Sequence, residues 1–183
     1  IVTNNTFNGS GVSGGTAISF HNHDNDNASY GTFVIGGAGN ENDFNANIGK
    51  VIYLDHQSGT SSGSTFPAYT SLIGAGAGAL TTMGLWAVDV DATNNNFDVG
   101  SGLQLPSAMS LSNLFSLEDR IQHSIDASGL GFVRVKANND YVTVNSFASP
   151  LSTTAKIQRG VNAASNGHTV NVGPGSFDDN VLV

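Results

Sequence analysis

The hydrophobic positions in the first half of the chain form short runs, and each run follows a polar corner. Three corners at 4–8, 40–45 and 94–98 share asparagines followed by phenylalanine and a further Asn or Asp. Asparagine tolerates the left-handed backbone of a tight corner, and its side chain can bond the neighbouring backbone. We therefore expect the asparagines to bond one another in a ladder, with each phenylalanine turned inward.

An apolar segment follows each corner, at 17–20, 51–54 and 102–105. Strands that repeat in this way bury their apolar sides only against the neighbouring repeat, which predicts a parallel β-solenoid. The unequal spacing of the corners indicates insertions, and 21–29 and 58–68 are the expected loops. A β-sandwich of short strands is the alternative.

The first helix signal lies in the second part of the chain. Ser116, followed by two acidic residues, is a typical helix start, and Gly129 is a typical end. Between them, Ile121 and Ile125 would lie on one face of the helix.

A second helix is expected between a cap at Thr153 or Thr154 and an end at Gly167, with Ile157 and Val161 on its apolar face. The two helices resemble each other in sequence, and each precedes a predicted strand, the first at residues 132–135 and the second at residues 169–172.

Three parts of the chain follow from these signals. Residues 1–109 are predicted to form the solenoid coils with their loop insertions. Residues 110–152 would be a linking module with a helix and a strand, and residues 153–183 a capping helix and the first coil of a further solenoid. The predicted fold is therefore mainly all-β, with a small helical component.

Composition supports an extracellular protein with many turns. The 183 residues include 23 glycines and no cysteine, and only 11% are charged, whereas an ordinary globular protein has about 25%. Asparagine, serine and threonine supply most of the polar surface. The net charge of −8 would repel nucleic acid, and no apolar run is long enough to span a membrane. The residues that follow Ile1 lack the basic and apolar pattern of a signal peptide, so the sequence predicts none in this segment.

The charges are divided unequally along the chain. Lys50 is the only basic residue before Arg120, whereas eight of the fourteen acidic residues lie within residues 1–117. This division predicts two regions with different surfaces.

The C-terminal 27 residues resemble a known family. The segments 157–164 and 166–177, followed by the acidic-Asn-Val step at 178–181, resemble the opening of right-handed parallel β-helix domains of the pectin-lyase-like superfamily. There a short amphipathic helix caps the first coil, and a Gly-Asp-Thr-Val strand follows. His168 stands where the family usually has Asp, and Phe177 where it has Tyr. The resemblance implies a right-handed parallel β-helix, used as a repeat in large bacterial surface proteins.

The order of these signals predicts self-assembly. The start signature lies at the C-terminal end, and segments resembling later coils lie at the N-terminal end, so both ends would leave an uncovered coil. We expect copies to stack head to tail, as tandem repeats or separate subunits, because heterologous contacts that do not close generate filaments. The predicted interface residues are Ile1, Val2 and Phe7 at one end and Val170, Val172, Phe177, Val181 and Val183 at the other.

Catalytic signals are weak. The resemblance implies either a basic residue beside calcium or a cluster of carboxylates on successive coils, and residues 1–117 offer only Lys50. Asp89 and Asp91 could share the face of a strand, but no partner carboxylic acid is evident. The sequence therefore predicts that the chain is not an enzyme.

The densest set of possible metal ligands lies at 21–27. Asp24 and Asp26 alternate with asparagines and are oxygen donors of the kind that calcium prefers, to which Glu41 and Asp43 could add. A solvated loop and a transition-metal site at the two histidines of this segment are the alternatives.

Together these observations predict an extracellular structural unit that assembles with copies of itself into a fibre, sheath or surface adhesin. The alternative is a carbohydrate-binding or polysaccharide-degrading β-helix domain with an extracellular glycan as its partner.

Overall fold

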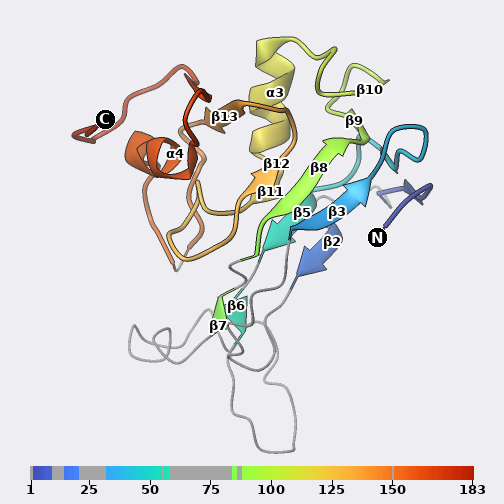
Figure 1. The fold of residues 1–183 in the computed structure, drawn as a ribbon, viewed down its shortest axis with the longest axis horizontal. Coiled ribbons are helices and arrows are strands. Elements are labelled where there is room, and N and C mark those ends of the chain that lie inside the picture. Colours follow the sequence, from blue (N-terminus) through green and yellow to red (C-terminus); the bar gives the residue numbers. More distant parts are fainter. Residues whose placement is uncertain are drawn as a thin grey trace, which may run out of the picture.

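The structure is a computed structural model that describes residues 2–9, 15–20, 32–54, 56–57, 84–85, 88–149 and 151–183 (Figure 1). Within these ranges the helices are α3 (Leu111–Glu118) and α4 (Ile157–Ala163). The strands are short and are, in chain order, β1 (Thr6–Phe7), β2 (Thr16–Phe20), β3 (Phe33–Gly36), β4 (Asp43–Phe44), β5 (Lys50–Leu54), β6 (His56–Gln57), β7 (Gly84–Leu85), β8 (Val90–Asn94), β9 (Asn96–Asp98), β10 (Leu103–Gln104), β11 (Ile121–Gln122), β12 (Val133–Arg134), β13 (Asn139–Val142) and β14 (Thr169–Val172).

The strands form small sheets in which most pairs are parallel. The sheet orders are β1-β4-β9-β10, β11-β5-β2 and β12-β8-β3, and β13 pairs with β14 separately. Strand β10 turns back antiparallel on β9, and β6 pairs antiparallel with β7. The 53-residue register step from Asp43 to Asn96 shows that long segments separate strands that lie side by side.

The predicted fold class is wrong. Instead of a mainly all-β solenoid, the described residues form a mixed arrangement of small sheets and short helices, with neither a continuous β-helix nor a closed barrel among them. Two features interrupt the expected regularity: β10 reverses direction, and α3 follows it before the chain returns to pair β11 with β5. The alternative of a β-sandwich is not found either, because sandwich sheets are antiparallel and these are mostly parallel.

The local prediction for the polar corners is confirmed. The ring of Phe44 stacks between those of Phe7 and Phe97, with ring centroids 4.7 Å and 5.0 Å apart and interplanar angles of 6° and 14°. Phe44 and Phe97 are fully buried. The three rings therefore join β1, β4 and β9 through one apolar column.

The expected asparagine ladder runs beside this column. The Asn5 amide donates to the Asn42 side-chain oxygen at 3.0 Å, and the Asn42 amide donates to that of Asn95 at 2.8 Å. Asn95 in turn donates to the carbonyl oxygens of Ile35 and Ala92. The ladder thus satisfies polar groups that the short strands leave in the interior.

The first predicted helix is wrong in position. Helix α3 ends at Glu118, near where a start was expected, and Ser110 caps its beginning by accepting a hydrogen bond from the Asn113 backbone at 3.2 Å. Beyond it, Ile121 lies in β11 and Ile125 in a turn, and both are fully buried. The two isoleucines therefore enter the core from separate elements rather than from one helical face.

The second helix and the strand after it were predicted close to their observed places. Helix α4 is shorter than expected, and neither Thr153 nor Thr154 caps it. Instead the carboxylate of Asp179, on the segment that returns past the helix, accepts the backbone N–H of Gln158 at 2.9 Å. Strand β14 has the predicted bounds.

One apolar core crosses the expected boundary at 109–110. Phe97 and Ile52 from the first part pack in the same cluster as Leu117, Ile121 and Tyr141 from the second. The division into 1–109, 110–152 and 153–183 stays a prediction. Within the described ranges, neither helix has the length and apolar character needed to cross a bilayer.

Candidate functional site

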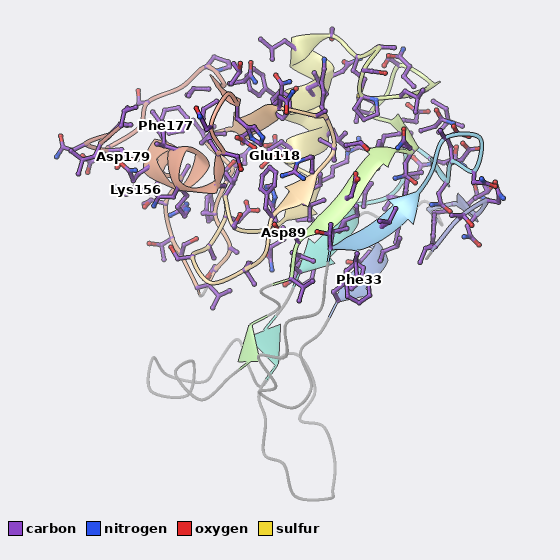
Figure 2. All side chains as sticks on the ribbon, viewed as in Figure 1. Phe33, Asp89, Glu118, Lys156, Phe177 and Asp179 are labelled. Atoms are coloured by element: carbon purple, nitrogen blue, oxygen red, sulfur yellow. The ribbon has the colours of Figure 1, made fainter. Side chains whose placement is uncertain are left out.

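Three ionisable side chains meet in the interior where α3, β11 and β12 come together. Glu118 is the last residue of α3, His123 follows β11, and Asp126 lies in the next turn. Their exposed fractions are 3%, 1% and 3%. Figure 2 shows Glu118 on α3, apart from the labelled residues around α4. We call these three residues the buried acid–imidazole cluster.

The hydrogen bonds of His123 define its protonation. The Val133 backbone N–H donates to the ring Nδ1 at 3.0 Å, so this nitrogen must be an acceptor. The proton of the neutral ring then lies on Nε2, which is 2.7 Å from the Glu118 carboxylate oxygen Oε1. The ring also stacks on Phe132, with centroids 5.1 Å apart. His123 therefore connects the end of α3 to the start of β12.

Opposing influences act on the pKa of His123. Burial disfavours the charged ring, but the carboxylates of Glu118, Asp126 and Asp140 outweigh it and raise the pKa. A second proton on the ring would have to sit on Nδ1, where the Val133 N–H already points. The hydrogen bond to Val133 thus favours the neutral tautomer in the folded chain.

The negative charge of the Asp126 carboxylate is the least compensated charge in the cluster. Its Oδ2 accepts the backbone N–H of His123 at 2.9 Å. Burial raises the pKa of Asp126 to about 6, the charge of His123 opposes this rise, and that of Glu118 adds to it. The side chain is therefore much easier to protonate than an exposed aspartate.

The cluster has the composition of a metal site but not the hydrogen bonds of one. Glu118, His123 and Asp126 each offer one ligand atom, and these atoms lie within 4.8 Å of one another. A histidine that binds a metal through Nε2 carries its proton on Nδ1. Here that proton would face the Val133 N–H, so the arrangement suits a proton better than a metal ion.

A second buried pair lies nearby on β13. The Asp140 carboxylate oxygen Oδ2 is 3.1 Å from His168 Nδ1, and Asp140 is fully buried. Its other oxygen, Oδ1, has no hydrogen-bond partner among the described residues. Burial raises the pKa of Asp140, and it raises that of the adjacent Tyr141 to about 12.

Basic side chains do not neutralise these carboxylates directly. Lys50 Nζ donates to the carbonyl oxygens of Asp119 and Ile121. Arg120 and Arg159 likewise donate to backbone carbonyls, the latter to three of them. In the described part of the chain the salt bridges to carboxylates come from His123 and His168.

Of the four residues predicted to bind calcium, the structure describes Glu41 and Asp43. Asp24 and Asp26 lie outside the described residues. The carboxylate of Glu41 accepts the Gly39 backbone N–H at 2.8 Å, whereas Asp43 in β4 accepts the Asn96 amide at 2.9 Å. The calcium site stays a prediction.

The other two candidate carboxylates support the fold. Asp89 accepts the Phe132 backbone N–H at 2.8 Å, and Asp91 accepts the backbone N–H and the hydroxyl of Thr93. These bonds hold β8 to the segment before β12 and stabilise β8 itself.

The predicted interface residues lie toward the two ends of the chain. Ile1 is outside the described residues, Val2 forms an isolated parallel bridge with Ile35, and Phe7 lies in β1. At the other end Val170 and Val172 lie in β14. The remaining members, Phe177, Val181 and Val183, lie in the segment after β14, where Val181 and Val183 are exposed.

The buried acid–imidazole cluster escaped prediction because its members looked like local helix signals. Glu118 follows Ser116 and suggests the first turn of a helix, whereas the structure places it in the last turn. The signal that could have revealed the cluster is the short spacing in sequence. An acid and an imidazole, Glu118 and His123, lie within a few residues of the two apolar positions Ile121 and Ile125.

Comparisons of the chain with protein-family models, with curated proteins and with solved structures find no match. The resemblance of the C-terminal residues to the pectin-lyase-like superfamily therefore stays a prediction.

Proposed function

We propose that the chain is a structural unit that assembles end to end with further copies of itself at an extracellular or cell-surface location. The unit would add a parallel strand from one copy to the open edge of another. The observation that carries this proposal is the ladder of asparagines and phenylalanines, whose outermost layer among the described residues is β1. Its repeated contacts suit the addition of a further layer.

The first surface involved is the outer side of β1. Within the described ranges β1 pairs only with β4, and the Phe7 ring stacks only on Phe44. Thr6 and Asn5 are exposed beside it. Since a strand edge presents backbone donors and acceptors, a further strand can extend the sheet there.

The second surface is the outer side of β14 with the segment that follows it. Among the described residues β14 pairs only with β13. Val172 is 41% exposed and Leu182 is 80% exposed, so apolar side chains accompany this edge. The labelled N and C ends of the chain lie on opposite sides of the molecule in Figure 1. A contact between these two different surfaces would be heterologous and would give an open filament.

The test is the concentration dependence of the molecular mass. Light scattering behind size exclusion should show species larger than the 18.8 kDa monomer as the concentration rises, and negative-stain micrographs should show filaments. The double variant Val172→Lys/Leu182→Lys should remain monomeric. Leu111→Lys, which changes a 51% exposed leucine at the start of α3, is the matched control and should assemble normally.

Mixing tests whether the contact is heterologous. A second variant, Thr6→Lys, should block the β1 side while leaving β14 intact. Each blocked chain alone should be monomeric, whereas an equal mixture should form dimers that grow no further. A wild-type chain that stays monomeric at every concentration would contradict the proposal, and so would loss of assembly in the Leu111→Lys control.

A further inference from the structure

The buried acid–imidazole cluster contains more acid than base. Glu118 and Asp126 are two carboxylates, and His123 is one imidazole whose Nδ1 is occupied by the Val133 N–H. The single ring proton on Nε2 faces Glu118, so it does not compensate Asp126. A carboxylate buried without a compensating charge costs free energy unless it takes up a proton.

The charged groups that face the cluster from neighbouring elements do not remove this imbalance. Lys50 on β5 and Arg159 on α4 attract Asp126 at a distance, but both donate their hydrogen bonds to backbone carbonyls. Asp140, on β13, acts in the opposite direction because it adds negative charge near His123. The neighbouring Tyr141 is neutral and adds no charge. The surroundings therefore leave Asp126 as the group that gains most from a proton.

We propose that the buried acid–imidazole cluster is an acid-strengthened clasp, in which a proton taken up at mildly acidic pH tightens the junction of α3, β11 and β12. The proton is held mainly on the Asp126 carboxylate. Its Oδ2 still accepts the His123 backbone N–H, and the Val133 bond to His123 Nδ1 is kept.

The direction of the pH effect follows from the pKa values. Burial raises the pKa of Asp126 from 3.8 to about 6, so between these values the folded chain binds a proton that the unfolded chain does not. Folding stability therefore increases as the pH falls through this window and is highest below it. The carboxylates also raise the pKa of His123 against the effect of burial, but a second ring proton would have to displace the Val133 N–H from Nδ1, so His123 is not part of this contribution.

The folded and unfolded pKa values of Asp126 also give the expected size of the change in folding stability. A pKa difference of about two corresponds to a roughly 100-fold change in the folding equilibrium constant between pH 8 and pH 4. This contribution is obtained as the difference between the wild-type chain and Asp126→Asn, because acidic residues outside the cluster titrate equally in both.

The experiment is urea unfolding of both chains from pH 4 to pH 8. The ratio of the wild-type to the Asp126→Asn folding equilibrium constant should rise roughly 100-fold from pH 8 to pH 4, with nearly all of the change between pH 6 and pH 4. Asp178→Asn is the matched control, since Asp178 is exposed, and its ratio should stay within about twofold. A flat ratio for Asp126→Asn, or one that changes in the opposite direction, would overturn the proposal.

A second measurement uses the wild-type chain alone and requires only that its NMR resonances be assigned. The carboxyl carbon of Asp126 should titrate near pH 6 in the NMR spectrum of the wild-type chain, and the Val133 amide should remain protected through that titration. A carboxyl midpoint below pH 4 would refute the clasp. Loss of Val133 protection near pH 6 would also refute it, because the proton would then lie on His123 Nδ1.

Discussion

Asn42 donates its side-chain amide to the side-chain oxygen of Asn95 at 2.8 Å, and neither residue is exposed to solvent. This bond joins two layers whose residues are 53 positions apart in the sequence. The same Asn95 oxygen also accepts the Asn42 backbone N–H, and the Asn95 amide donates to two carbonyls. Asn95 is therefore the residue through which β3, β8 and the β4 corner are joined.

Replacing Asn95 by alanine should destabilise the fold substantially. The change leaves the Asn42 amide and the carbonyl oxygens of Ile35 and Ala92 without these partners inside the protein, and we expect a loss of about 2–4 kcal/mol. Urea unfolding followed by circular dichroism measures it. Asn94→Ala is the matched control, because Asn94 is the exposed neighbour with one long side-chain bond, and it should cost less than about 0.5 kcal/mol. Equal losses in the two variants would contradict this role of the ladder.

Gly36 should not tolerate alanine for two reasons, its backbone conformation and the lack of space for a Cβ atom. Its φ is +80°, and an added Cβ would lie 2.2 Å from the Asn94 carbonyl oxygen and 2.5 Å from Asn95 Oδ1. Gly39 has a similar φ of +77° but nothing within 4 Å of its Cβ position. Gly39→Ala should therefore cost about 1 kcal/mol from the backbone alone. Gly36→Ala should lower the melting temperature much further, and similar melting temperatures would argue against the close packing.

The corners could be predicted because their signal is local. In Asn95 and Phe97 the ladder amide and the inward ring are two positions apart, and the same spacing recurs at Asn42 and Phe44. The alternating pattern at 169–172 likewise predicted β14 with its observed bounds. In these cases the side chains that determine the element lie within it.

The remaining features depend on contacts that are distant in sequence. Asp179 accepts the N–H of Gln158 from 21 residues away, which no local capping rule reveals. Ser110 and Ser116 are both acceptable helix starts, and the burial of Leu114 and Leu117 favours the earlier one. The predicted solenoid was wrong because the periodic corners say nothing about the reversed strand β10 and the helix α3 that follow the last of them.

Arg159 should hold α4 to the rest of the fold through its fixed planar geometry. Its Nε donates to the Ile125 carbonyl at 2.6 Å, and its Nη2 donates to those of Ser146 and Thr154 at 2.7 Å each. Lysine keeps the charge but cannot reproduce this fork, so Arg159→Lys should cost about 1–3 kcal/mol.

Hydrogen exchange should show where Arg159→Lys acts, with faster exchange at 157–172. Arg134→Lys is the matched control, because Arg134 lies 5.6 Å from the Phe132 ring centroid, where a lysine can also place its cation. If exchange in α4 were unchanged by Arg159→Lys, the helix would be held mainly by its apolar contacts.

His168 should contribute strongly to folding stability only while the Asp140 carboxylate is charged. Among the described residues, the imidazole is the only hydrogen-bond partner of the fully buried Asp140 carboxylate, whose second oxygen has none. His168→Ala should therefore cost about 2–4 kcal/mol near pH 7.5. Burial already raises the pKa of Asp140, and removal of His168 should raise it further. The raised pKa favours the protonated form of Asp140 in the folded chain, so the loss of stability should shrink as the pH falls toward 4.

In the Asp140→Asn background, which removes the buried charge, His168→Ala should cost less than about 1 kcal/mol at every pH. Unfolding of the four chains at pH 4.5 and 7.5 completes this double-mutant cycle, and a pH-independent loss of equal size in both backgrounds would show that His168 contributes packing rather than compensation of charge.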